Sequence, residues 1–145
     1  MPRLDAERVA LWRRLSVVLA ELQRHLDLQL NEMHGVRLTW FEAMSAIRDS
    51  GGRIRIGELC ESLGEVPSSL SRRLDRMEDL GLISRAVSQS GDDRRSVTVA
   101  LTADGRVAWR DANITYRRLV QQRFASRLTD TDVTALQRVL TKASR

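Results

Sequence analysis

The sequence contains few cysteine, lysine and aromatic residues, and it has no long apolar run. With one cysteine, Cys60, it cannot form an internal disulfide, and a cytoplasmic location is the simplest expectation. No apolar run approaches the ~18 residues that cross a membrane. The first residues include acidic ones and lack the apolar stretch of a signal peptide. We therefore expect neither membrane insertion nor export.

Motifs for catalysis are also missing. The sequence shows no glycine-rich phosphate loop followed by lysine, and no nucleophile motif. Its two histidines stand alone and do not have the spacing of a metal site. We expect no enzyme activity, no cofactor and no metal. The 42% hydrophobic and 30% charged residues are instead typical of a globular protein, and 145 residues favour one domain or two small lobes that share a core.

The basic residues are almost all arginine, and the net charge of +5 suits a polyanionic partner. That excess is confined to residues 103–145, which hold nine basic and four acidic groups. Residues 1–52 and 53–102 each carry equal numbers of both. If the middle of the chain binds nucleic acid, it must do so by clustering its arginines.

Hydrophobic periodicity predicts long helices at both ends of the chain. From Asp5 to about Asn31, apolar residues recur every three or four positions. Thr102 is expected to cap a helix that reaches about Leu128, and Thr129 to begin a final helix up to Ala143. The first stripe is long for a helix that packs only within its own domain, and it could serve a partner helix.

Short elements are predicted between these helices. Thr39 and Glu42 have the spacing of a capping box, and Pro67 suits the first turn of a helix. The expected elements are a helix over 40–49, a strand over 53–56, helices over 57–63 and 67–80, and strands over 82–87 and 96–101. Two short helices followed directly by a hairpin describe a winged helix-turn-helix.

The second helix of this unit and the hairpin tip carry the candidate DNA contacts. Hydroxyls near a helix N-terminus can bind phosphates or base edges, and arginine can read guanine in the major groove. The candidates on the helix are Ser68, Ser69, Ser71, Arg72, Arg73 and Arg76. At the tip, Arg94 and Arg95 would enter a minor groove, with Asp92 and Asp93 holding them by ion pairing. The alternative for each arginine is a solvated surface charge.

In this order the motifs resemble those of the MarR family of transcriptional regulators. The resemblance covers about residues 36–106 and includes LTWFEAMSAI, GGRIRIGELCESLG, SSLSRRLDRMEDLGLISR and DDRRSVTVALTADGR. The last stretch is similar to the family's wing signature, D-x-R followed by a strand that ends in L-T-x-x-G. Three positions depart from the family pattern: Arg73 and Glu65 replace apolar residues, and Val66 replaces a capping hydroxyl.

The resemblance implies a mainly α fold with a small β wing. Residues 1–36 would form an N-terminal dimerisation helix, residues 37–102 the winged helix-turn-helix lobe, and residues 103–145 the C-terminal dimerisation helices. The implied function is a homodimeric, sequence-specific regulator, most simply a repressor, on a pseudo-palindromic operator with half-sites about 10 bp apart. Two alternatives remain open: a constitutive DNA binder without an effector, and a winged-helix module that binds proteins.

The resemblance also implies a small-molecule effector, since members of the family often release DNA when an anionic aromatic compound binds between the dimer helices and the lobe. The candidates for such a pocket are Trp12, Met33, His34, Trp40, Phe41, Met44 and Tyr116. The alternative is that these side chains only pack the core. Cys60 falls at an apolar helix position, so we expect a buried structural thiol rather than a peroxide sensor.

Overall fold

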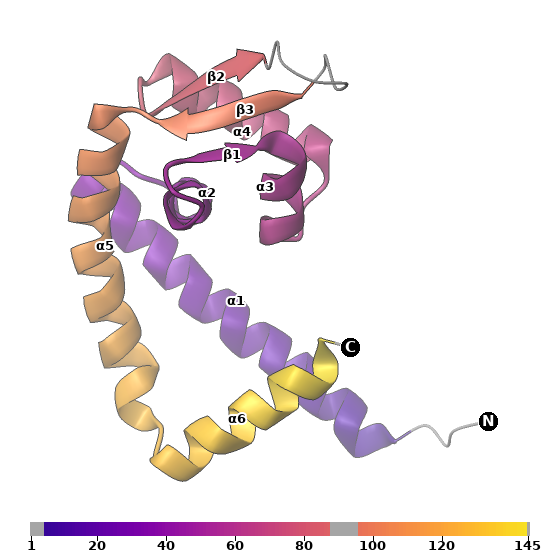
Figure 1. Ribbon diagram of the computed structural model, residues 1–145. Coiled ribbons are helices and arrows are strands. Elements are labelled where there is room, and N and C mark those ends of the chain that lie inside the picture. Colours follow the sequence, from indigo (N-terminus) through magenta and orange to yellow (C-terminus); the bar gives the residue numbers. More distant parts are fainter. Residues whose placement is uncertain (1–4, 88–95, 145) are drawn as a thin grey trace.

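The computed structural model describes residues 5–87 and 96–144, which form a helical protein with one small sheet (Figure 1). This confirms the predicted fold class. The elements are α1 (Ala6–His34), α2 (Leu38–Asp49), β1 (Arg53–Arg55), α3 (Ile56–Leu63), α4 (Pro67–Asp79), β2 (Ile83–Val87), β3 (Val97–Leu101), α5 (Ala103–Arg123), the 3-10 turn η1 (Ala125–Arg127) and α6 (Asp130–Ala143).

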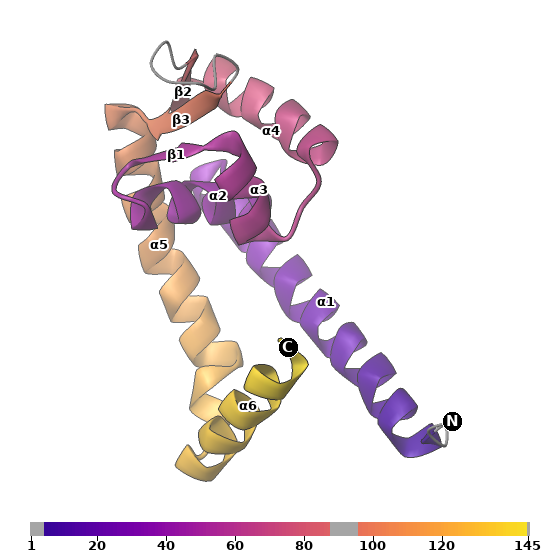
Figure 2. The same ribbon diagram turned by 45° about the vertical axis from the view of Figure 1, so that its right-hand side comes forward.

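A compact lobe and a set of long helices make up the arrangement. Helices α2, α3 and α4 and the sheet lie together at one end, and α1, α5 and α6 extend away from them (Figures 1 and 2). The sheet is antiparallel with the order β1-β3-β2. The predicted hairpin is therefore β2–β3, with Ile83 opposite Leu101. Residues 88–95 at its tip lie outside the described residues.

The core of the lobe is built from one side of each short helix and one face of the sheet. On α4 the buried side chains are Leu70, Leu74 and Met77, three or four positions apart. They pack with residues of α2 and with the sheet residues Ile83 and Val99, which are also buried. Cys60 on α3 belongs to this core and is 6% exposed, which confirms that its thiol is buried.

The predicted capping box at the start of α2 is wrong. The helix begins at Leu38, one residue before Thr39, and Arg37 occupies the N-cap position without a side-chain cap bond. Asp27 of α1 takes over this role: its Oδ1 accepts hydrogen bonds from the backbone N–H of Leu38 at 2.9 Å and from Arg37 Nε at 3.1 Å. The first N–H of α2 is thus satisfied by a residue from another helix, which local sequence spacing does not reveal.

The caps of the two C-terminal helices agree with prediction, but the length of α5 does not. The Thr102 hydroxyl accepts a hydrogen bond from the N–H of Gly105, and Thr129 and Asp132 form a capping box. Helix α5 ends at Arg123 because the backbone at Phe124 leaves helical geometry, with φ −127° and ψ −65°. The expected continuation to Leu128 is instead the separate turn η1.

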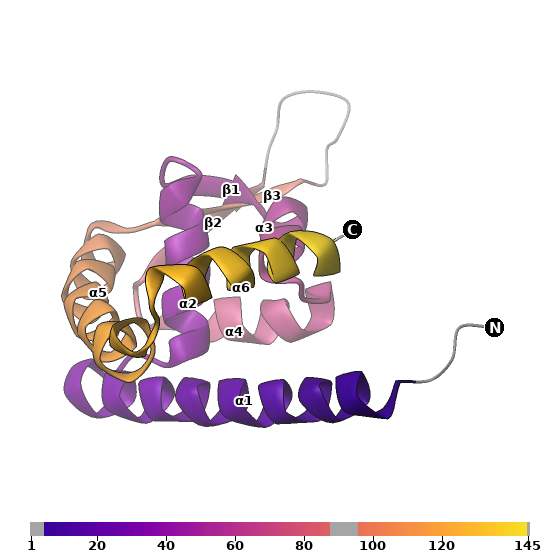
Figure 3. The same ribbon diagram turned by 90° about the horizontal axis from the view of Figure 1, so that it is seen from below.

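Apolar side chains remain exposed on the long helices. No residue of α6 is buried, and Leu30 is the buried residue of α1. Figure 3 shows α1 and α6 as separate helices: α1 runs from the N-terminus toward the α5 side, and α6 runs away from the α5 side to the C-terminus. The large exposed apolar residues on these two helices are Val9, Leu11, Trp12, Leu15, Val17, Val18, Leu19, Leu28, Met33, Val133, Val139 and Leu140. Within the described part of the chain, no helix has the length and apolar character to span a membrane.

Candidate nucleic-acid interface

Helix α4 presents a polar row to solvent opposite its buried side. Ser68, Arg72 and Arg76 are spaced four residues apart, so they follow one another along the same side of the helix. All three are exposed, as are the predicted contacts Ser69 and Ser71. The structure therefore brings five of the six helix residues that the sequence singled out to solvent.

The N-terminus of α4 has no side-chain cap. Pro67 is the first helical residue, and Val66 at the N-cap makes no side-chain hydrogen bond to the helix. The first-turn N–H groups of a helix are left without intrahelical partners, and together with the helix dipole they favour anions. This helix end therefore suits a phosphate group beside the exposed Ser68 and Ser69.

Arg73, the sixth predicted residue, faces the interior of the lobe. Its side chain is 13% exposed. Its Nη2 donates a hydrogen bond to Glu65 Oε1 at 2.9 Å and lies 2.8 Å from Glu65 Oε2, which is buried and makes no hydrogen bond of its own. Its Nη1 donates to the carbonyl oxygen of Thr39 at 3.5 Å. The two departures from the family pattern, Arg73 and Glu65, are therefore paired with each other.

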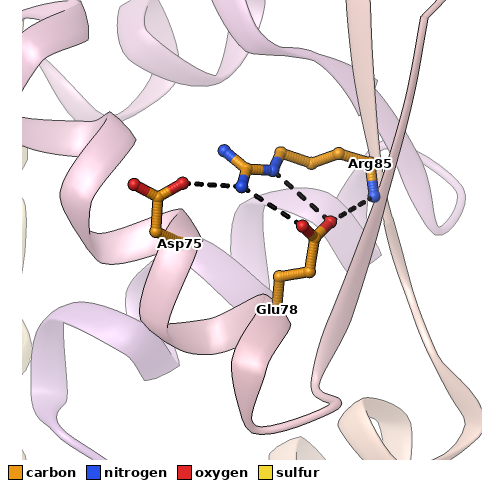
Figure 4. A network of polar contacts seen from close by, with 3 residues as sticks. All are labelled: Asp75, Glu78 and Arg85. Carbon is orange, nitrogen blue, oxygen red and sulfur yellow. Dashed lines mark hydrogen bonds and ion pairs between the residues drawn. The ribbon is translucent and has the colours of Figure 1, made fainter.

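A second ionic cluster holds the hairpin on α4 (Figure 4). Arg85 on β2 places its Nη2 2.6 Å from Asp75 Oδ1 and 3.2 Å from Glu78 Oε1, and its backbone N–H donates to Glu78 Oε2 at 3.0 Å. The hydrogen bond from the Arg85 side chain lowers the pKa of Glu78 and raises that of the arginine. Sequence reasoning missed this cluster. Its signal was a pair of acids three positions apart on a helix, followed by an arginine in the next strand.

The L-T-x-x-G motif forms the corner between β3 and α5. Thr102 Oγ1 donates to the carbonyl of Gly81 at 2.5 Å, and the Thr102 N–H donates to the carbonyl of Leu82 at 3.1 Å. A Cβ at Gly105 would stand 1.9 Å from that same Leu82 oxygen. The threonine and the glycine thus hold the start of α5 against the turn between α4 and β2, which only a residue without a side chain permits.

Comparisons with known proteins agree with this geometry. The family model described as MarR family matches residues 34–96. The solved structures that resemble the chain include Sco3205 of Streptomyces coelicolor, a MarR family transcriptional regulator in complex with DNA. That structure is 26% identical, with a TM-score of 0.90 over 99% of this chain and 90% of the other. The chain is therefore similar to MarR family proteins, in sequence over residues 34–96 and in fold over nearly its whole length.

Two further solved structures resemble the chain. A variant of Escherichia coli MarR complexed with operator DNA is 26% identical, with a TM-score of 0.81 over 97% of this chain and 99% of the other. AbsC, a MarR family transcriptional regulator of S. coelicolor, has a TM-score of 0.86 at 24% identity and covers 99% and 96% of the two chains. No curated protein sequence matches the chain. Sco3205 and AbsC are both transcriptional regulators, and this likeness supports a regulator rather than an enzyme.

The residues named for an effector pocket do not form one group in the structure. Phe41 and Met44 are buried in the core of the lobe, and the Phe41 ring lies 4.6 Å from that of Tyr116. Trp40 is partly buried and packs against the same core. His34, at the end of α1, places its Nε2 2.7 Å from the hydroxyl of Thr115 on α5, so its ring has a partner within the protein.

The other two pocket candidates are exposed. Trp12 is 67% exposed and Met33 is 51% exposed. An apolar cavity of about 250 Å³ lies instead between α1 and α5, and Tyr116 is the predicted residue that lines it. Its other walls include Leu19, Leu22, Leu26, Leu119, Val120 and Phe124. The described residues contain no cluster of three or more His, Cys, Asp or Glu side chains that could hold a metal ion.

Proposed function

We propose that this protein is a homodimeric, sequence-specific DNA-binding transcriptional regulator whose helix α4 enters the major groove. The observation that carries the proposal is the exposed row of Ser68, Arg72 and Arg76 beside a helix N-terminus without a side-chain cap. Hydroxyls and first-turn N–H groups suit phosphates, and Arg72 and Arg76 suit base edges or phosphates. Sco3205 and E. coli MarR, with the same fold, are bound to DNA in their structures.

The hairpin supplies the second contact of the proposed interface. Arg94 and Arg95 at its tip would enter a minor groove, and Asp92 and Asp93 would steady them by ion pairing. These four residues lie outside the described part of the chain. Support comes from the strands that carry them, because Arg85 fixes β2 to α4 and so relates the position of the hairpin to that of the helix.

A second copy of the chain would cover the exposed apolar residues of α1 and α6. Trp12 is 67% exposed and Leu140 is 63% exposed, and large apolar side chains left exposed along a helix are typical of protein interfaces. Residues 1–36 and 103–145 would then be the dimerisation helices, and 37–102 the DNA-binding lobe. Two lobes related by a two-fold axis fit a pseudo-palindromic operator with half-sites about 10 bp apart.

We further infer that the dimer is a repressor that a small aromatic or phenolic compound releases from DNA. The support is the pocket of about 250 Å³ between α1 and α5, which combines apolar side chains with Tyr116 and Arg123, because ligand sites are mostly apolar with a few polar groups. Such a ligand acts only through its preference for a dimer that is unsuited to the operator. A ligand-dependent rise in melting temperature would reveal the binding, because a ligand of the native state alone stabilises it.

Fluorescence anisotropy with the DNA upstream of the protein's own gene, against a shuffled duplex of equal length, tests the DNA-binding proposal. Arg72→Gln should weaken binding to the preferred duplex by ~1–3 kcal/mol if the side chain reads a base, or reduce the salt slope by ~1 if it holds a phosphate. Arg110→Gln is the matched control, because Arg110 is an exposed arginine of α5, outside the lobe helices. Equal losses in the two variants would contradict the role of α4. Absence of binding by the wild type even at low salt would favour a protein-interaction module.

A further inference from the structure

The side chain of Arg73 joins three elements of the lobe. It starts from α4, pairs with Glu65 in the turn that follows α3, and reaches the carbonyl oxygen of Thr39 in the first turn of α2. The pair is largely withdrawn from solvent, with the Glu65 side chain 25% exposed. Glu42, half-buried on α2, adds a second carboxylate whose charge acts on this arginine. Arg73 thus contacts the Glu65 carboxylate and the Thr39 carbonyl, which lie on two different elements.

On its other side, helix α2 contacts the long helices α1 and α5. The indole Nε1 of Trp109 on α5 donates a hydrogen bond to Ser45 Oγ at 2.8 Å, and the Phe41 ring packs on Tyr116. At its N-terminus, α2 is capped by Asp27 of α1. Helix α2 thus packs on the frame formed by α1 and α5, and the Thr39 carbonyl in its first turn is the point that Arg73 of α4 reaches.

The apolar anchors of α4 keep one side of the helix buried but make no directional bonds to α2. Leu70 and Leu74 are among these buried anchors, and apolar contacts are not directional. The N-terminus has no side-chain cap that would fix it. Charge-assisted hydrogen bonds of arginine are directional, and their loss would leave the largely buried Glu65 carboxylate without its partner.

We propose that Arg73 is a positioning residue that fixes the orientation of α4 on α2, and through α2 on the α1–α5 frame. This inference rests on the proposed function, since the orientation of α4 matters for operator recognition. It assigns Arg73 a different role from Arg72, its neighbour in sequence. Arg72 meets DNA, and Arg73 determines how Arg72 and the serines are presented to it.

A double-mutant cycle with Arg73→Gln, Glu65→Gln and the double variant tests the proposal, with Arg72→Gln as the control. Binding is measured to the preferred and shuffled duplexes across a salt series. We expect Arg73→Gln to lower the preference for the operator about threefold or more without changing the salt slope, and the double variant to be no worse than the arginine variant alone. A salt slope reduced by ~1 would show a phosphate contact and overturn the proposal. Losses from the two single variants that simply add would also overturn it.

Arg73→Lys keeps the positive charge but lacks the planar guanidinium group, whose two Nη atoms reach both Glu65 and Thr39. We expect a lowered preference for the operator at an unchanged salt slope in this variant too. Full wild-type preference with lysine would overturn the positioning role. If Arg73→Gln fails to fold, Arg73→Lys tests the positioning role in its place.

Hydrogen exchange without DNA separates this proposal from the proposed function. Arg73→Gln or Arg73→Lys should accelerate exchange of the backbone amides in the second turn of α4, and Arg72→Gln should not. Faster exchange with no DNA binding by the wild type would keep the positioning role and reject the DNA-binding function. Unchanged exchange in both Arg73 variants would reject the positioning role even if the protein binds its operator.

Discussion

Replacement of Gly105 by alanine should destabilise the protein, although alanine is the better helix former. Gly105 lies in the first turn of α5, and its Cα is pressed against the carbonyl of Leu82. A Cβ there would be 1.9 Å from the Leu82 oxygen and 2.9 Å from its carbon. Because both obstacles are backbone atoms, no side-chain rotation can relieve the overlap. The β3–α5 corner would have to open.

The expected size of the effect follows from two opposing contributions. Overpacking of a well-packed site costs about 1–3 kcal/mol and occasionally more, whereas replacing glycine with alanine in a helix gains at most ~1 kcal/mol. Opening the corner would also strain the hydrogen bond from the Thr102 N–H to the Leu82 carbonyl, which is 3.1 Å long. The free energy of unfolding should therefore fall by roughly 1–2 kcal/mol.

Gly57→Ala is the matched control for this prediction. Gly57 lies in the first turn of α3 with a negative φ, and a Cβ there would meet no atom within 4 Å. Alanine should stabilise the protein by about 0.4–1 kcal/mol at this position. Urea denaturation at one fixed protomer concentration measures both variants. A Gly105→Ala protein as stable as the wild type would refute the close approach of α5 to the Leu82 carbonyl.

Two further predictions concern carboxylates whose pKa the fold changes. Burial raises the pKa of Glu42 despite the nearby charge of Arg73, so its native carboxyl holds a proton more tightly than the unfolded one, and stability falls as pH rises from the ordinary pKa of glutamate to the raised value. Glu42→Gln should remove this fall and be more stable than wild type at neutral pH; urea titrations at pH 4–8 that give parallel curves for both proteins would contradict it. Burial alone would raise the pKa of Asp27, but the hydrogen bonds from Arg37 and Leu38 lower it, so its contribution is present above the ordinary pKa of aspartate and is lost as pH falls through the lowered value. Asp27→Ala should reduce the free energy of unfolding by ~1 kcal/mol at pH 7 and by little near pH 3, and a loss of equal size at both pH values would show that the cap does not depend on charge.

The sequence predicted most of the features that depend on a local pattern of residues. The apolar stripe of α4, the alternation of β2 and β3 and the caps at Thr102 and Thr129 were all readable, because each depends on residues within a few positions of one another. The start of α2 was not readable, since its cap comes from Asp27, eleven residues before Leu38. The orientation of Arg73 was hidden for a related reason. A basic residue beside Arg72 resembles another surface charge until the fold brings Glu65 and the Thr39 carbonyl to it.

The same limit applied to the effector candidates. Conspicuous aromatics could be named from the sequence, but Phe41 proved to pack in the core and Trp12 to lie exposed on α1. Four of the ten residues that line the cavity between α1 and α5 are leucines, which carry no signal in a helical stripe. The crossing of α1 and α5 determines which of their residues line the cavity. That crossing depends on how the helices pack, and the spacing of residues in the sequence does not reveal it.

Selection of duplexes from a random DNA library by the full-length protein tests the central claim most directly, because it assumes no operator. The account predicts one enriched sequence with two inverted half-sites about 10 bp apart, bound by one dimer per duplex. Affinity for that duplex should exceed affinity for a shuffled one by ~10³-fold or more, with a steep dependence on salt. Binding without enrichment of any sequence, or no binding at low salt, would contradict a sequence-specific regulator.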